Sequence, residues 1–147
     1  MKTLASIIVL AATAFVVSAG FVRADEKSDP IATPDALAKA GGEEIYRRVC
    51  QGCHMPDGRG AVGGGTYPAL AENPHLASAQ FTAATVALGR HNMPHFAAQP
   101  ELGGFEQFVT LHLDDRQIAA VVNYVRSHFG NHYTDEITPA DVAALHH

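Results

Sequence analysis

The stretch Cys50-Gln51-Gly52-Cys53-His54 has the pattern C-x-x-C-H, and the rest of the chain is best understood outward from it. Two thiols three residues apart on one helical turn can both reach the vinyl groups along one edge of a porphyrin. The next residue can then place its imidazole at the iron. The pattern therefore predicts one covalently bound haem c, attached through Cys50 and Cys53, with His54 as an axial iron ligand.

Three other uses of the two cysteines fit the sequence less well. A redox-active C-x-x-C favours a thioredoxin-like β-α-β setting, and no β-α-β pattern is visible. A structural zinc site usually needs four nitrogen or sulfur ligands, and the chain has no second pair of cysteines. A plain disulfide suits an exported protein but gives His54 no role.

A second axial ligand is expected from among three methionines, Met1, Met55 and Met93. Met1 belongs to the first, apolar segment. Met55 adjoins His54, and one backbone step cannot place both side chains on opposite faces of a planar macrocycle. Met93 lies in a predicted loop before Pro94, and a thioether there would raise the potential of the iron. Met93 is the predicted ligand, with plain core packing as its alternative role and His91 and His95 as rival ligands.

Residues 1–24 are predicted to be a signal peptide. Lys2 gives a positive start, and residues 4–22 carry no charge. Val17-Ser18-Ala19 and Val22-Arg23-Ala24 both fit a small-x-small cleavage site, and the second is preferred because a polar stretch follows Ala24. The alternative is an uncleaved membrane anchor, because the apolar stretch is just long enough to span a bilayer. Either way the remainder, 25–147, is predicted to be exported to the periplasm.

The composition is that of an ordinary globular protein with one domain. Of its 147 residues, 47% are hydrophobic and 17% charged, and the formal net charge is −5. No basic excess exists, so a nucleic-acid partner is not expected. Two Cys exclude a disulfide-rich scaffold. The exported part is predicted to form a single domain, with a core over 34–130 and a C-terminal tail over 131–147.

Local patterns predict an all-α fold of three to five short helices with long loops. The first helix is expected to run from the cap at Thr33-Pro34 toward Cys50, with Gly41-Gly42 as a candidate interruption. Residues 57–65 hold five Gly, and no regular element is expected there. A second helix is predicted over 81–88, closed by Gly89. The next loop covers 89–104, and 105–113 fits either a short strand or a helical turn.

The last helix carries the strongest signals. Asp114 or Asp115 can cap it, and Gln117 completes a capping box with Asp114. Gly130 is the predicted stop, and Thr138-Pro139 is one more cap signal. The apolar positions with helical spacing are Ile118, Val121, Val122, Val125 and Phe129.

Residues 38–129 resemble class I cytochrome c. In that family a glycine and an aromatic residue on the first helix meet an aromatic residue on the last, here Gly42, Tyr46 and Tyr124. A proline after the glycine-rich loop, here Pro68, accepts a hydrogen bond from the histidine ligand, and Leu70 would pack on the haem. The resemblance implies a small class I cytochrome c fold around one covalent haem. The apolar residues expected to surround the haem are Ile45, Val49, Leu70, Leu88, Phe96 and Val121.

A narrower resemblance covers Asn123 to Tyr133, which is similar to haem domains in cytochrome c subunits of periplasmic dehydrogenases. Those subunits accept electrons from alcohol, gluconate, sorbitol or aldehyde dehydrogenases, and many carry three haems. This chain has one C-x-x-C-H and therefore resembles one detached domain. The resemblance implies an electron carrier rather than an enzyme. Its donor would be a periplasmic dehydrogenase, and its acceptor another cytochrome or a terminal oxidase.

The chain departs from the simplest members of the family between Met93 and Asp114, which lie 21 positions apart. The extra residues include 100–105. They are either a tolerated surface insertion or an element that docks a partner or shields the haem. Two rival functions also stand. One is a haem protein with an open sixth position, such as a gas sensor or a peroxidase-like enzyme. The other is a thiol oxidoreductase or metal carrier without haem.

Overall fold

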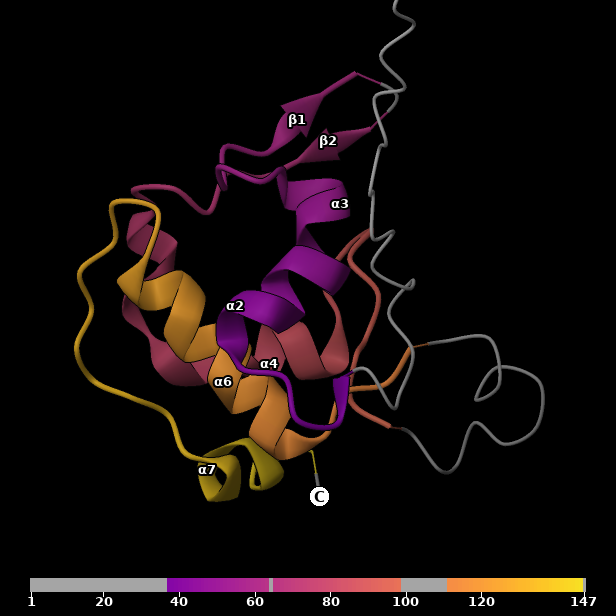
Figure 1. Ribbon diagram of the computed structural model, residues 1–147, viewed down its shortest axis with the longest axis vertical. Coiled ribbons are helices and arrows are strands. Elements are labelled where there is room, and N and C mark those ends of the chain that lie inside the picture. Colours follow the sequence, from indigo (N-terminus) through magenta and orange to yellow (C-terminus); the bar gives the residue numbers. More distant parts are fainter. Residues whose placement is uncertain (1–36, 64, 99–110, 147) are drawn as a thin grey trace, which may run out of the picture.

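The computed structural model describes residues 37–63, 65–98 and 111–146 (Figure 1). The predicted signal peptide, the start of the first helix and the residues 100–105 lie outside the described residues. The described elements confirm the all-α prediction. They are α2 (Gly42–Ile45), the π-helical turn η1 (Tyr46–Cys50), α3 (Gln51–His54), β1 (Ala61–Val62), β2 (Thr66–Tyr67), the 3-10 turn η2 (Pro74–Ala77), α4 (Ala79–Leu88), α6 (Asp115–Ser127) and α7 (Pro139–Ala143).

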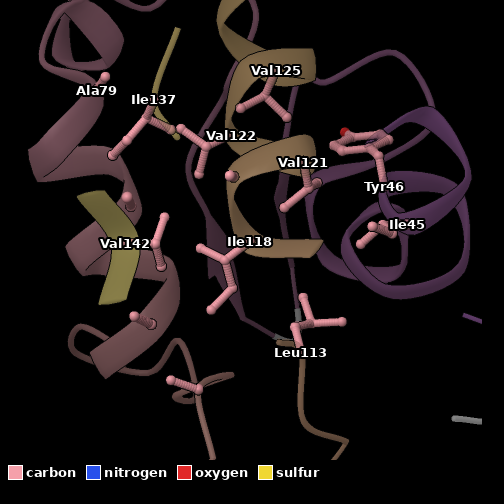
Figure 2. Close-up of a cluster of buried hydrophobic side chains, with 14 of the residues drawn as sticks. Ile45, Tyr46, Ala79, Leu113, Ile118, Val121, Val122, Val125, Ile137 and Val142 are labelled. Atoms are coloured by element: carbon pink, nitrogen blue, oxygen red, sulfur yellow. The ribbon is translucent and has the colours of Figure 1, made fainter. Parts of the chain in front are cut away.

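Helix α6 occupies the centre of the fold and packs against α2, α4 and α7 (Figure 1). Its predicted capping box is confirmed: the Gln117 backbone N–H donates to Asp114 Oδ1, and the Asp114 N–H donates to Gln117 Oε1. Figure 2 shows Val121 on the side of Tyr46, and Val122 on the side of Val142. One helix thus carries apolar side chains to two neighbouring layers.

The predicted stop at Gly130 is wrong, because α6 ends at Ser127. The carbonyl of Val125 would bond the N–H of Phe129 in a longer helix, but it accepts from the Asn131 side chain instead, at 2.8 Å. Phe129 and Gly130 then take positive φ values of 57° and 80°, which turn the chain away from the helix axis. The backbone is already extended at His128, and the Asn131 side chain satisfies a carbonyl that the end of the helix leaves free.

Helices α2 and α6 cross at Gly42, as the small residue at this position predicts. A Cβ on Gly42 would lie 2.2 Å from the carbonyl oxygen of Ala120 and 2.6 Å from the Tyr124 Cβ. The rings of Tyr46 and Tyr124 lie beside this contact with centroids 5.8 Å apart. The helices can approach this closely only because no side chain stands between them.

Gly42→Ala is expected to destabilise the fold by about 3 kcal/mol, the upper end of the usual overpacking cost, because the clashing atom is backbone. Urea unfolding of the haem-loaded protein measures the change. Gly41→Ala is the matched control, since a Cβ at Gly41 meets nothing within 4 Å. Equal stability of both variants would contradict the crossing.

The residues after 130, expected as a tail, complete the core. Ile137 and Val142 are buried in the same apolar cluster as the α6 side chains. Helix α7 begins at the predicted cap, where the Asp141 N–H donates to Thr138 Oγ1 and the Thr138 N–H donates to Asp141 Oδ2. Among the residues that the structure describes, no helix combines the length and apolar character that crossing a bilayer requires.

The prediction of no regular element over 57–65 is wrong in part. Strands β1 and β2 pair antiparallel, with Ala61 opposite Tyr67 and Val62 opposite Thr66. The Gly63 N–H donates to the Gly65 carbonyl at 3.0 Å, which helps close the reversal. A strand of two residues is too short to show an alternating pattern, so the sequence indicated only the glycine-rich loop and not the strands.

Candidate haem site

A cavity of about 360 Å³ lies between the C-x-x-C-H segment, η2, α4 and α6. Its volume falls within the range of small-ligand sites, about 300–1,000 Å³. Its lining is mainly apolar, and none of the described residues that form it is Asp or Glu. The lining residues are Cys50, His54, Pro68, Leu70, Asn73, His75, Leu76, Phe81, Thr82, Thr85, Val86, Arg90, Met93, Val121, Val122 and Val125.

His54 ends α3 with its side chain buried to 8% exposure. Its Nδ1 lies 2.9 Å from the carbonyl oxygen of Pro68, the contact implied by the family resemblance. A carbonyl can only accept, so Nδ1 carries the proton and donates it. The tautomer leaves the lone pair of Nε2 free to bind a metal, and the bond fixes the orientation of the ring.

Cys50 and Cys53 stand on the same turn but in different surroundings. Cys50 lines the cavity, whereas Cys53 is exposed and is not among the lining residues. Burial raises the pKa of the Cys50 thiol to about 12, and the neighbouring Cys53 adds to the rise. Thiol-disulfide chemistry needs a thiolate, which Cys50 does not supply at neutral pH. The apolar surroundings therefore keep Cys50 in its neutral thiol form.

The π-helical turn η1 ends on Cys50, the first residue of the C-x-x-C-H segment. The Gln51 N–H donates to the Tyr46 carbonyl, a span one residue longer than an α-helical bond. Tyr46 also donates its hydroxyl proton to the Met55 carbonyl at 2.7 Å, just past the end of α3. Both contacts tie the C-x-x-C-H segment to Tyr46, which is buried and whose ring contacts those of the partly buried Tyr124 and Phe129. The sequence showed no sign of the wide turn.

Met93 lines the cavity, whereas the rivals His91 and His95 do not. Its loop closes tightly: the Arg90 N–H donates to the Met93 carbonyl at 3.1 Å, and the Met93 N–H donates to the Arg90 carbonyl at 2.9 Å. Gly89 makes this possible with φ of 75°, and a Cβ there would lie 2.8 Å from the Met93 carbonyl oxygen. Of these three candidate ligands, the structure therefore brings Met93 to the cavity that His54 lines.

Asn131 is a residue of the site that the sequence did not single out. It is buried, and its side chain donates to the carbonyls of Leu70 and Val125, each at 2.8 Å. Its Oδ1 accepts from the Asn73 N–H at 2.9 Å. Asn131 thus holds the segment between Pro68 and Asn73 against the end of α6. Asn73 and Leu70 are 58 and 61 positions away from Asn131, beyond any local pattern.

The lining fits a haem. The wall is mainly apolar, His54 presents a metal-binding nitrogen, and the cavity receives a thioether from Met93. Among the apolar residues expected around the haem, Leu70 and Val121 line the cavity. The other four are not lining residues: Ile45, Val49 and Phe96 pack in or against the core, and Leu88 is 49% exposed. Within the described residues, no three His, Cys, Asp or Glu side chains gather as an alternative metal site.

Comparison with known proteins agrees with this site. The cytochrome c family model matches residues 40–129. The alcohol dehydrogenase (quinone) cytochrome c subunit of Gluconobacter oxydans is 33% identical over 122 residues, 75% of this chain and 24% of its own length. The fructose dehydrogenase cytochrome subunit of Gluconobacter japonicus is 32% identical over 94 residues, 61% of this chain and 19% of its own. This chain therefore spans about a quarter or less of these relatives.

Proposed function

This chain belongs to the cytochrome c family, and on that basis we propose that it carries single electrons through one haem c, held by Cys50 and Cys53 with His54 and Met93 as axial iron ligands. The haem supplies one-electron chemistry between Fe(III) and Fe(II). The observation that carries the proposal is the shared cavity: Cys50 and His54 of the C-x-x-C-H segment and Met93, 39 positions after His54, all line it.

The chain's own residues would keep both ligands in place while the charge of the iron changes. The bond from His54 Nδ1 to the Pro68 carbonyl holds the imidazole, and the paired backbone bonds between Arg90 and Met93 hold the thioether loop. Retained ligands mean little rearrangement on electron transfer. Since the two protein ligands would fill both axial positions, no position is left for a substrate, which suits a carrier rather than an enzyme.

The donor we propose is a dehydrogenase that oxidises an alcohol or a sugar. Its support is the similarity to cytochrome subunits of alcohol and fructose dehydrogenases. We propose the periplasm as the place of this exchange, on the strength of the apolar N-terminal pattern. The acceptor would be another cytochrome or a terminal oxidase.

The donor is tested by mixing the oxidised, haem-loaded protein with membranes that contain quinone-dependent alcohol dehydrogenase. Adding alcohol is expected to convert the visible spectrum to that of the reduced protein within seconds to minutes. Membranes without alcohol, and heat-inactivated membranes with alcohol, are the controls. A parallel reaction uses membranes with fructose dehydrogenase and fructose. If dithionite reduces the protein but neither dehydrogenase does, the proposed donor class is wrong.

A further inference from the structure

Arg126 is a charged side chain placed almost completely inside the protein. It lies on α6 with 1% of its side chain exposed. Its neighbour Val125, and Val122 one turn earlier, both line the cavity. Moving a guanidinium out of water costs free energy. A buried arginine is therefore tolerated only when its N–H groups find hydrogen-bond acceptors.

Arg126 donates its hydrogen bonds mainly to backbone carbonyls. Its Nε donates to the Leu76 carbonyl at 2.9 Å, and its Nη2 donates to the Ala77 carbonyl at 3.1 Å. The side chain also bonds the backbone carbonyl of Asp135, and its guanidinium carbon lies 5.3 Å from the Tyr133 ring centre. Leu76 itself lines the cavity. The bonds therefore fix a positive charge directly behind one part of the cavity wall.

The charge is only partly balanced. The carboxylate that Arg126 meets belongs to Asp135, with Nη2 and Oδ1 2.7 Å apart. Arg126 lowers the pKa of Asp135, so that carboxyl is ionised at neutral pH. However, the Asp135 side chain is 69% exposed, so water screens its field far more than that of the buried guanidinium. No carboxylate stands among the described lining residues, whereas a second cation, Arg90, does. The Arg126 charge therefore has no negative side chain opposing it from the described cavity wall.

We propose that Arg126 raises the reduction potential of the haem, acting through the cavity wall as a fixed positive charge. This inference rests on the proposed function, that the cavity holds a haem c. Reduction adds one electron, so a nearby cation favours the reduced state over the oxidised state. If Arg126 acted only through its hydrogen bonds to Leu76 and Ala77, it would connect α6 to η2 and affect stability alone. A role for its charge predicts in addition a change in the reduction potential of the haem.

The test measures the midpoint potential of the haem-loaded protein by optical titration in three variants, with urea unfolding of each as a second readout. Arg126→Met removes the charge and is expected to lower the potential by about 59 mV, a tenfold shift in the ratio of oxidised to reduced protein. Arg126→Lys keeps the charge but cannot make all the bonds. It is expected to lose stability as Arg126→Met does, yet to keep a potential near that of the wild type.

Asp135→Asn changes the local charge in the opposite direction from Arg126→Met, because it removes a negative charge. Its position is exposed, so the fold should tolerate the change. Removing the partner carboxylate is expected to raise the potential, whereas Glu136→Gln, next along the chain, is the control and should shift it less. Equal falls in Arg126→Lys and Arg126→Met would overturn the charge role, as would a fall in Asp135→Asn. If the Arg126 variants do not fold, a potential of Asp135→Asn that equals the wild-type value also overturns it. Absence of covalent haem from the wild-type protein would instead refute the proposed function.

Discussion

Protein in which both Cys50 and Cys53 are replaced by alanine is expected to carry no covalently bound haem after purification. Each thioether joins one sulfur to the porphyrin, and the double substitution removes both. What remains is His54 and the apolar wall, from which a haem can dissociate. Haem stain on a denaturing gel, and the mass of the polypeptide, measure the loss. The expected loss is complete in the double variant.

The matched control lies inside the same motif. Gly52→Ala keeps the C-x-x-C-H pattern, and its new Cβ meets nothing within 4 Å, so full loading is expected. Each single cysteine variant keeps one sulfur and should load partially or release haem on storage. A double alanine variant with normal covalent haem would refute attachment through these two residues.

Met93→Ala is expected to remove the second protein ligand while the haem stays attached. The oxidised protein should lose the weak far-red absorbance band that marks a methionine–iron bond in class I cytochromes c. The potential should fall by the equivalent of at least a tenfold shift in the oxidised-to-reduced ratio, about 59 mV, because a thioether favours Fe(II). Small ligands such as cyanide should then bind rapidly at the vacated position.

Met55→Ala is the control for Met93→Ala, because it removes the same side chain next to His54 at a position that is not among the lining residues. It should keep the far-red band and the potential. If Met93→Ala kept both as well, another residue would be the second ligand. If the wild-type protein already bound cyanide rapidly, the open sixth position of a sensor or peroxidase-like protein would be the better account.

The parts of the fold that the sequence predicted are those with local causes. The α6 cap needs only Asp114 and Gln117, three positions apart, and the C-x-x-C-H segment lies within one helical turn. The place of Gly42 at the crossing of the first and last helices was implied by the family resemblance, and its small size is compatible with that place. The bond between His54 and Pro68 spans 14 positions and came from the family resemblance rather than from spacing.

The parts that the sequence could not predict depend on contacts between distant segments. Asn131 donates to the carbonyl of Val125 near the end of α6 and also to that of Leu70, 61 positions earlier. Arg126 reads as an ordinary polar position on a helix, and only the fold shows that Leu76 and Ala77 surround its charge. Ile45 and Phe96 were expected beside the haem but do not line the cavity, for the same reason. Apolar character predicts burial, but not which cavity a buried residue faces.

The central claim, a haem held by His54 and Met93 for one-electron transfer, is tested most directly by one optical potentiometric titration of the purified wild-type protein. The account predicts a single reversible transition with the slope of one electron, a low-spin spectrum in both states, and the far-red methionine band in the oxidised state alone. A high-spin spectrum without that band, or no haem absorbance at all, would contradict it.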